Sequence, residues 1–196
     1  MFTGIVQAVG VIAKSSTTKL GATFWIDAPE ITRSLEVGDS VCTQGVCLTA
    51  VSLRGEAFCV DVSAETLRRT TLGAWAVGTR ANLELPLTLS DRLGGHLVSG
   101  HVDGVGQVVA VEEEGAGRIV TFQAPPSIMR YTIEKGSVTI DGVSLTLFAL
   151  EGDRFKVALI PHTLEVTTLG ALKAGDRVNL EADMIGKYVE RLMPRA

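Results

Sequence analysis

Four positions of this 196-residue chain change chemical type between two copies of an internal repeat, and the changed residues include those best suited to catalysis. The differing pairs are Ile5/His101, Gln44/Asp141, Cys47/Ser144 and Glu65/His162. An ionised thiol such as that of Cys47 is a nucleophile, and an imidazole such as that of His101 transfers protons near neutral pH. The two copies are therefore expected to play different chemical roles.

Lys135 and His96 join this set without a clear counterpart in the first copy. Each candidate also has a structural interpretation: Cys47 as a small core residue, His96 as a structural hydrogen-bonding group, and Lys135 as a surface charge beside a turn. The spacing of Cys47, His96 and His101 does not match a paired Cys/His motif, so we expect no metal site. The sequence also has no Gly-Lys phosphate loop and no strand–GxGxxG–helix unit.

The repeat covers nearly the whole chain, with residues 1–10 matching residues 97–106. At an offset of 97, the 44 aligned pairs between residues 41–84 and 138–181 include 21 identical pairs. This indicates a duplicated domain with a junction near the glycines before His96. We expect a first domain over 1–96, a second over 97–183 and a terminal helix over 184–196.

Several polar or small residues are shared by the two copies. They are Thr49/Thr146, Thr66/Thr163 and Gly4/Gly100. Threonines favour strands and helix caps, which is one explanation. The other is a pair of equivalent pockets that bind the same kind of polar ligand.

Each copy is expected to be mainly β-structure. Val and Ile are frequent, and apolar and polar residues alternate, as in residues 58–62. About six short strands per copy favour a small closed antiparallel barrel, because closure removes exposed edges. The fold class is therefore all-β, with two tandem six-stranded barrels.

Short helices are predicted over Ala64–Leu72 and Pro161–Leu169. Gly73 and Gly170 are expected to end them in the left-handed conformation, and Pro161 suits a first helical turn. Residues 184–193 break the repeat and place apolar residues on one helical face: Ile185, Tyr188, Val189 and Leu192. That stripe must pack on the chain's own barrel or on a partner subunit.

The composition limits the classes of partner. The net charge is −4 and charged residues make up 20% of the chain, without a basic cluster, so no nucleic-acid partner is expected. Apolar runs are far shorter than a membrane span, and the N-terminus lacks a signal pattern. Three cysteines without paired spacing indicate free thiols in a reducing compartment. We predict a cytoplasmic protein.

The sequence resembles the riboflavin synthases of the trimeric type, which are built from two lumazine-binding barrels. The resemblance runs from Met1 to about Met193 and rests on several motifs: MFTGIVQ (1–7), GVCLT (45–49), ETL (65–67) with TTLG (70–73), GGHLVSGHVDG (94–104), KGSVTIDGVSLT (135–146) and IPHTLE (160–165). Together these motifs are highly specific.

The resemblance implies a transferase that moves a four-carbon unit between two molecules of 6,7-dimethyl-8-ribityllumazine. The products are riboflavin and 5-amino-6-(ribitylamino)uracil, and no metal or organic cofactor takes part. It implies a homotrimer in which the N-terminal barrel of one subunit meets the C-terminal barrel of its neighbour. The terminal helix, residues 184–193, is expected to form the trimer contact.

The resemblance also assigns chemical roles. We expect His101 to be the leading base or proton shuttle and His96 a second candidate, with Cys47 adding to the ring or positioning the nucleophile. Ser144 and Thr146 would hydrogen-bond the second ring. Three charged residues would tune the site: Lys135, Asp141 and Asp183.

The ligand contacts are expected to come from both copies. In the first copy they are Gly4, Ile5, Val6, Cys47, Leu48, Thr49, Asp61, Val62, Ser63, Ala64, Glu65 and Thr66. In the second copy they are Gly100, His101, Val102, Lys135, Ser144, Leu145, Thr146, Ala158, Leu159, Ile160, Pro161, His162 and Thr163.

Two other classes of function remain open. A lumazine-binding antenna protein shares the double barrel but performs no chemistry, and is expected to lack the asymmetric reactive residues. A transport barrel for another flavin explains the barrels but not the asymmetry. The presence of Cys47, His101 and Ser144 favours the enzyme.

Overall fold

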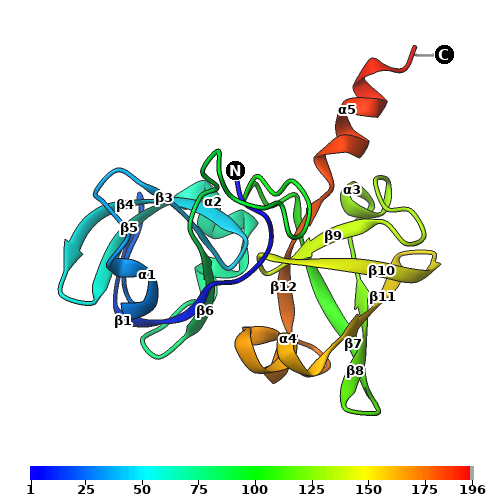
Figure 1. Cartoon of the computed structure of the whole chain (residues 1–196), viewed down its shortest axis with the longest axis horizontal. Helices are drawn as coiled ribbons and strands as arrows, with labels where there is room; N and C mark the ends of the chain where they lie inside the picture. The colour runs from blue at the N-terminus through cyan, green and yellow to red at the C-terminus, as the bar shows by residue number, and fades with distance from the viewer. Residues whose placement is uncertain (195–196) are drawn as a thin grey trace.

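The computed structural model describes residues 1–194 and contains two closed six-stranded antiparallel barrels (Figure 1). The first barrel has the strand order β1-β2-β5-β4-β3-β6, and the second the order β10-β11-β8-β7-β12-β9. The first comprises β1 (Ala8–Thr18), β2 (Gly21–Asp27), β3 (Ser40–Thr43), β4 (Val46–Arg54), β5 (Ala57–Ser63) and β6 (Arg80–Glu84). The second comprises β7 (Gly104–Glu114), β8 (Gly117–Gln123), β9 (Ser137–Ile140), β10 (Val143–Glu151), β11 (Arg154–Leu159) and β12 (Arg177–Ala182). The predicted fold class is confirmed.

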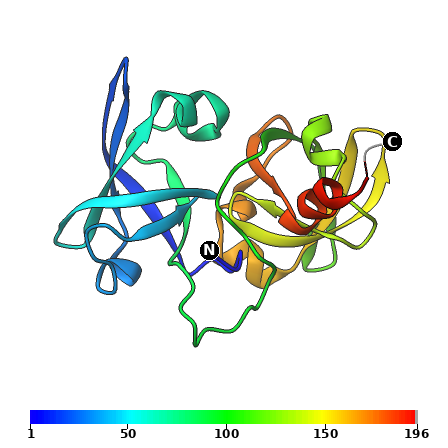
Figure 2. The same cartoon turned by 90° about the horizontal axis from the view of Figure 1, so that it is seen from above.

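Alternation of side chains builds a separate core inside each barrel. In β5, Phe58 and Val60 point inward and are fully buried, whereas Asp61 is exposed. Phe122 and Phe155 stack in the second barrel with ring centroids 5.7 Å apart. Each barrel thus closes around its own apolar cluster, and the two stand side by side in both views (Figures 1 and 2).

The short helices connect strands and cover barrel ends. They are α1 (Pro29–Thr32), α2 (Ala64–Arg69), η1 (Thr71–Ala74), α3 (Pro126–Met129), α4 (Pro161–Val166) and η2 (Thr168–Ala171). Pro161 occupies the first turn of α4, as predicted. The prediction of left-handed glycines at 73 and 170 is wrong, because both lie inside 3-10 turns. A Cβ on Gly73 would instead lie 2.5 Å from the Leu67 carbonyl oxygen, so close packing requires glycine there.

The segments that precede the two barrels are exchanged between them. Phe2 and Val98 pair antiparallel through two backbone hydrogen bonds, of 2.8 and 3.1 Å. The Ser144 N–H of the second barrel donates to the Gly4 carbonyl at 2.8 Å, and the Cys47 N–H of the first barrel donates to the Gly100 carbonyl at the same distance. The segment before each barrel therefore lies beside a strand of the other barrel: Gly4 beside β10 and Gly100 beside β4.

Two buried carboxylates hold these segments in place. Glu84 accepts hydrogen bonds from the backbone N–H groups of Thr3 and Gly4. Glu181 accepts the equivalent bonds from Ser99 and Gly100. Burial raises the pKa of both carboxyls, and these hydrogen bonds oppose the rise.

A symmetric polar seam joins the barrels at the tips of the β3–β4 and β9–β10 hairpins. Asn82 donates its side-chain amide to the Asp141 carbonyl at 2.9 Å, and Asn179 donates to the Gln44 carbonyl at 2.8 Å. Gln44 and Asp141 take positive φ values of 51° and 49° at the turns, as two-residue hairpins of this type require. Their side-chain oxygens accept the backbone N–H groups of the two asparagines.

The chain ends in α5 (Met184–Leu192), which extends away from the second barrel (Figure 1). Its predicted apolar stripe is exposed at 58% for Ile185, 65% for Tyr188 and 81% for Leu192. Lys187 ties the helix to the barrel through hydrogen bonds of 2.6 and 2.7 Å to the Asp103 carboxylate. No helix among residues 1–194 has the length and apolar character needed to cross a membrane.

Candidate functional site

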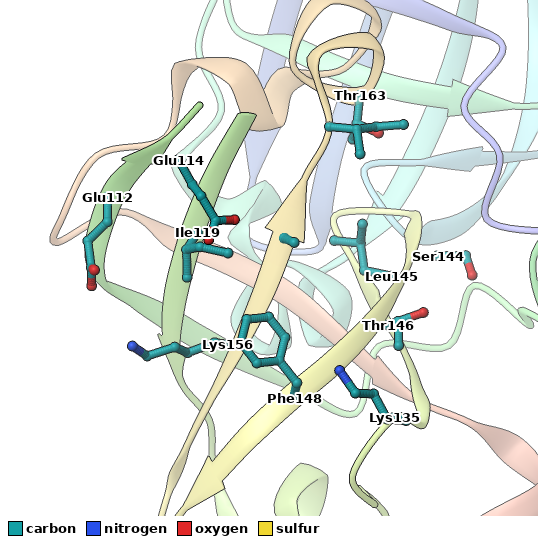
Figure 3. Close-up of a pocket in the computed structure, with 12 residues that line it drawn as sticks. Glu112, Glu114, Ile119, Lys135, Ser144, Leu145, Thr146, Phe148, Lys156 and Thr163 are labelled. Carbon is teal, nitrogen blue, oxygen red and sulfur yellow. The ribbon is translucent and has the colours of Figure 1, made fainter. Parts of the chain in front are cut away.

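A pocket with a volume of about 750 Å³ lies on the second barrel (Figure 3). Its lining residues come from β7, β8, the turn before β9, β10, β11 and the start of α4: Glu112, Glu114, Ile119, Lys135, Ser144, Leu145, Thr146, Phe148, Lys156, Ala158, Ile160 and Thr163. Seven of them were predicted from the sequence. Figure 3 shows Ser144 and Lys135 on one side of this pocket and Glu112 on the opposite side.

A histidine supports the Ser144 end of this pocket from behind. The Nδ1 atom of His96 lies 2.7 Å from Ser144 Oγ, and its Nε2 atom lies 3.1 Å from Thr139 Oγ1. His96 is 8% exposed and Thr139 is 1% exposed. Burial lowers the pKa of His96, and the negative charge of Asp183 partly offsets this by raising it. The imidazole is therefore neutral at pH 7 and can accept a proton.

The corresponding surface of the first barrel is divided into two smaller pockets. One, of about 240 Å³, is lined by Val46, Cys47, Glu65, Thr66, Arg69, Thr70, Gly100, His101 and Val102. The other, of about 450 Å³, includes repeat counterparts of second-barrel pocket residues, among them Ser16, Thr18, Thr23, Asp61 and Ser63. The two barrels thus present equivalent pockets with different side chains.

Segment exchange decides which predicted residues come together. His101 and Cys47 line one pocket although they belong to different copies. Val102 packs on the core of the first barrel, and Val6 packs on the core of the second. Ile5, the repeat counterpart of His101, lies half-exposed in a separate pocket with Gly94.

Three predicted contacts point into the barrel cores. The side chains of Leu48, Val62 and Leu159 are buried, so these residues can offer a ligand only their backbone groups. Pro161 and His162 are exposed at the start of α4 and line neither the 750 Å³ pocket nor the pocket that contains Cys47.

Several further predicted residues lie on or near the first-barrel surface. Thr49 is exposed on β4, Ala64 begins α2 and Glu65 binds Arg68 and Arg69. The hydrogen bonds from Arg69 and then Arg68 lower the pKa of Glu65.

The predicted charged residues have different surroundings. Lys135 has a positive φ of 62°, and its Nζ lies 5.0 Å from the centre of the Phe148 ring in the second-barrel pocket. Asp183 caps α5 by accepting a hydrogen bond from the Ile185 N–H and acts electrostatically on His96. Asp141 lies outside both pockets, buried in the seam between the barrels, where burial raises its pKa to about 7.

The three cysteines are free thiols, as predicted. Cys47 is partly exposed in its pocket, whereas its cross-strand neighbour Cys42 is buried. Burial, followed by the nearby Glu84 charge, raises the pKa of Cys42 well above its usual value. Cys47 is therefore the thiol of this pair that a ligand can reach. Among residues 1–194, no group of three His, Cys, Asp or Glu side chains is arranged to hold a metal ion.

Sequence reasoning missed the residues that hold the site together. These residues are Thr139, Glu84 and Glu181. Each lies in a strand of mostly apolar residues. The identity of Glu84 and Glu181 in the two copies was a usable signal, because a carboxylate kept twice inside a barrel strand needs a buried partner.

Comparison with known proteins agrees with the geometry. Residues 3–86 and 99–183 each match the family described as "Lumazine binding domain". The chain is 46% identical to riboflavin synthase of Mycobacterium bovis, with all of both chains covered. It is 38% identical to riboflavin synthase of Bacillus subtilis, over all of this chain and 91% of that one. The chain belongs to the riboflavin synthase family.

Two similar solved structures contain a bound lumazine or riboflavin. LumP complexed with 6,7-dimethyl-8-(1'-D-ribityl) lumazine superposes with a TM-score of 0.84 and 28% identity, covering 93% of this chain and 99% of that one. LumP complexed with riboflavin gives a TM-score of 0.86 and 30% identity with the same coverage. Membership of the riboflavin synthase family therefore agrees with the fold, the duplication and the two pockets.

Proposed function

We propose that this protein is a riboflavin synthase that converts two molecules of 6,7-dimethyl-8-ribityllumazine into riboflavin and 5-amino-6-(ribitylamino)uracil. The observation that carries the proposal is the pair of equivalent pockets with unequal reactive groups. One pocket contains Cys47 and His101, and the other contains Ser144 supported by His96. Two copies of one ligand site suit a reaction between two copies of one molecule.

The reaction requires three steps that these residues can serve. One lumazine loses a proton from its 7-methyl group, the other is attacked at C7, and two ring-opening eliminations follow with proton transfers. We assign His101 as the leading base or proton shuttle and His96 as a second base. Cys47 adds to the ring or positions the nucleophile, and Ser144 with Thr146 hydrogen-bonds the second ring.

The remaining contacts would bind the ring and the ribityl chain. Backbone groups of 4–6 would serve the second barrel and those of 100–102 the first, because of the segment exchange. Thr66 and Thr163 lie at equivalent places in the two pockets. Holding two ligands in a fixed orientation removes much of the entropic cost of a bimolecular step.

The active unit is proposed to be a homotrimer. The two pockets of one chain share no lining residue, and we propose that a complete site forms where the N-terminal pocket of one copy faces the C-terminal pocket of another. The exposed apolar stripe of α5 provides a contact for that assembly. We also propose three domains, 1–96, 97–183 and 184–196, and a cytoplasmic location. The proposed reaction uses no metal or cofactor, and we propose no nucleic-acid or membrane partner.

The proposal is tested by incubating the purified protein with the lumazine alone, without metal or reductant, and following riboflavin fluorescence. Riboflavin formation well above the spontaneous rate is expected. Tight lumazine binding without riboflavin formation would instead identify a binding protein. The matched variant His101→Gln keeps the size of the side chain and separates chemistry from binding.

A further inference from the structure

The buried hydroxyl of Thr139 contacts His96, the histidine that supports Ser144 in the second-barrel pocket. Thr139 on β9 and Ser144 on β10 are directly paired across the hairpin. Directly paired residues of an antiparallel ladder point to the same face of the sheet. Both hydroxyls meet the same imidazole, Ser144 at Nδ1 and Thr139 at Nε2. The imidazole is therefore held between two hydroxyls, of which only that of Ser144 belongs to a residue lining the pocket.

We propose that Thr139 is a positioning residue that accepts a hydrogen bond from Nε2–H of His96 and leaves Nδ1 free to accept a proton from Ser144. This proposal rests on the proposed function and deepens it, because it makes Ser144 and His96 a proton relay. In the relay, Ser144 Oγ accepts a proton from the bound lumazine while the hydroxyl proton of Ser144 moves to Nδ1. One C–H bond and one O–H bond break, one O–H bond and one N–H bond form, and the charge ends on the ligand carbanion and the imidazolium.

The surroundings support this arrangement. A neutral imidazole protonated at Nε2 has its lone pair at Nδ1, and a base oriented by a third group is the general design of such relays. Thr139 is 1% exposed and His96 is 8% exposed, so the contact between them is shielded from solvent. The charged group that acts on His96 is Asp183, which favours the imidazolium formed in the relay.

The internal repeat shows that the hydroxyl is a special feature of the second barrel. The counterparts of Thr139 and Ser144 are Cys42 and Cys47, which are also directly paired. Cys42 packs in an apolar cluster with Phe2 and Val98 instead of contacting an imidazole. The same strand position thus carries an apolar contact in one barrel and the histidine contact in the other.

The test replaces Thr139 by Val, which keeps the shape and removes the hydroxyl. Turnover of the lumazine is expected to fall roughly 10-fold or more, within the range of an impaired general base, while the Kd of the lumazine measured by fluorescence titration stays unchanged. Thr139→Ser keeps the hydroxyl and should restore most of the turnover. Thr121→Val is the control, because Thr121 is a similarly buried strand residue of this barrel that does not line its pocket.

A second readout does not depend on activity. Nitrogen-15 NMR of the histidines, with His96 assigned through His96→Gln, is expected to show His96 protonated at Nε2 in the unaltered protein and to lose that preference in Thr139→Val. Equal tautomer populations in both proteins, or equal losses of turnover in the Val and Ser variants, would overturn the proposal. If Thr139→Val does not fold, Thr139→Cys, which imports the residue of the first barrel, takes its place with the same readouts. Absence of riboflavin formation by the unaltered protein would refute the proposed function and leave the NMR test of Thr139 intact.

Discussion

Replacing Asp141 by Asn should stabilise the protein increasingly as the pH rises from 5 to 8. Asp141 is buried between the barrels, and its pKa is raised from 3.8 to about 7. The folded state therefore keeps a proton that the unfolded state releases, so the stability present below pH 3.8 is lost as the pH rises to 7. Asparagine presents the same carbonyl oxygen to the Asn179 N–H and has no proton to lose.

The size of the effect follows from the shift in pKa. Each pH unit between the unfolded and folded pKa values changes the free energy of unfolding by about 1.4 kcal/mol. From pH 5 to 7 this gives roughly 3 kcal/mol, and little change follows above pH 7. The difference in the free energy of unfolding between Asp141→Asn and the unaltered protein should therefore grow by about that amount between pH 5 and pH 8.

Urea unfolding at four pH values and one fixed protein concentration measures this difference. Asp141 also forms a side-chain hydrogen bond with Gln44. Any constant loss of stability caused by the substitution shifts all four values equally, so the slope with pH carries the test. Gln44→Glu is the mirror control, because it places a carboxyl at the equivalent position of the first barrel. That variant should lose stability relative to the unaltered protein over the same interval. A difference between Asp141→Asn and the unaltered protein that stays constant with pH would refute the reasoning.

Three further outcomes are expected. A thiol reagent applied to the folded protein should modify Cys47 before Cys42, because Cys42 is buried and its pKa is raised; mass spectrometry of peptides checks the order, and equal rates would contradict the placement of the thiols. Replacing His101 by Gln should reduce turnover about 100-fold or more if it is the general base, and unchanged turnover would remove it from the mechanism. Deleting residues 184–196 should weaken assembly in sedimentation experiments, whereas an unchanged sedimentation coefficient would show that α5 is not the subunit contact.

The barrels could be predicted from the sequence because their signals are local. Alternating residues such as Phe58 and Val60 specify which face of a strand is buried, and the repeat shows that the same barrel occurs twice. Gly73 shows the limit of this reasoning, because a glycine after a helix has the same local signature whether it adopts the left-handed conformation or allows close packing. In this chain, the reason is close packing, because a Cβ at position 73 would clash with the Leu67 carbonyl oxygen.

The candidate site could be predicted only in part, because its assembly depends on contacts between distant segments. The two copies predict that Cys47 and His101 are special, but not that the exchanged segments bring them into one pocket. The same comparison singles out Asp141, but Asp141 and its counterpart Gln44 make equivalent contacts in the seam and line neither pocket. Thr139 looked like an ordinary strand residue, and its role becomes visible only from the position of the His96 imidazole.

The stoichiometry of the reaction tests the central claim most directly. Purified protein is incubated with 6,7-dimethyl-8-ribityllumazine as the sole organic substrate, and substrate and products are quantified by chromatography as the reaction proceeds. The account predicts that two lumazines disappear for each riboflavin and each 5-amino-6-(ribitylamino)uracil formed. Bound but unconverted lumazine, or riboflavin formed without the uracil product, would contradict it.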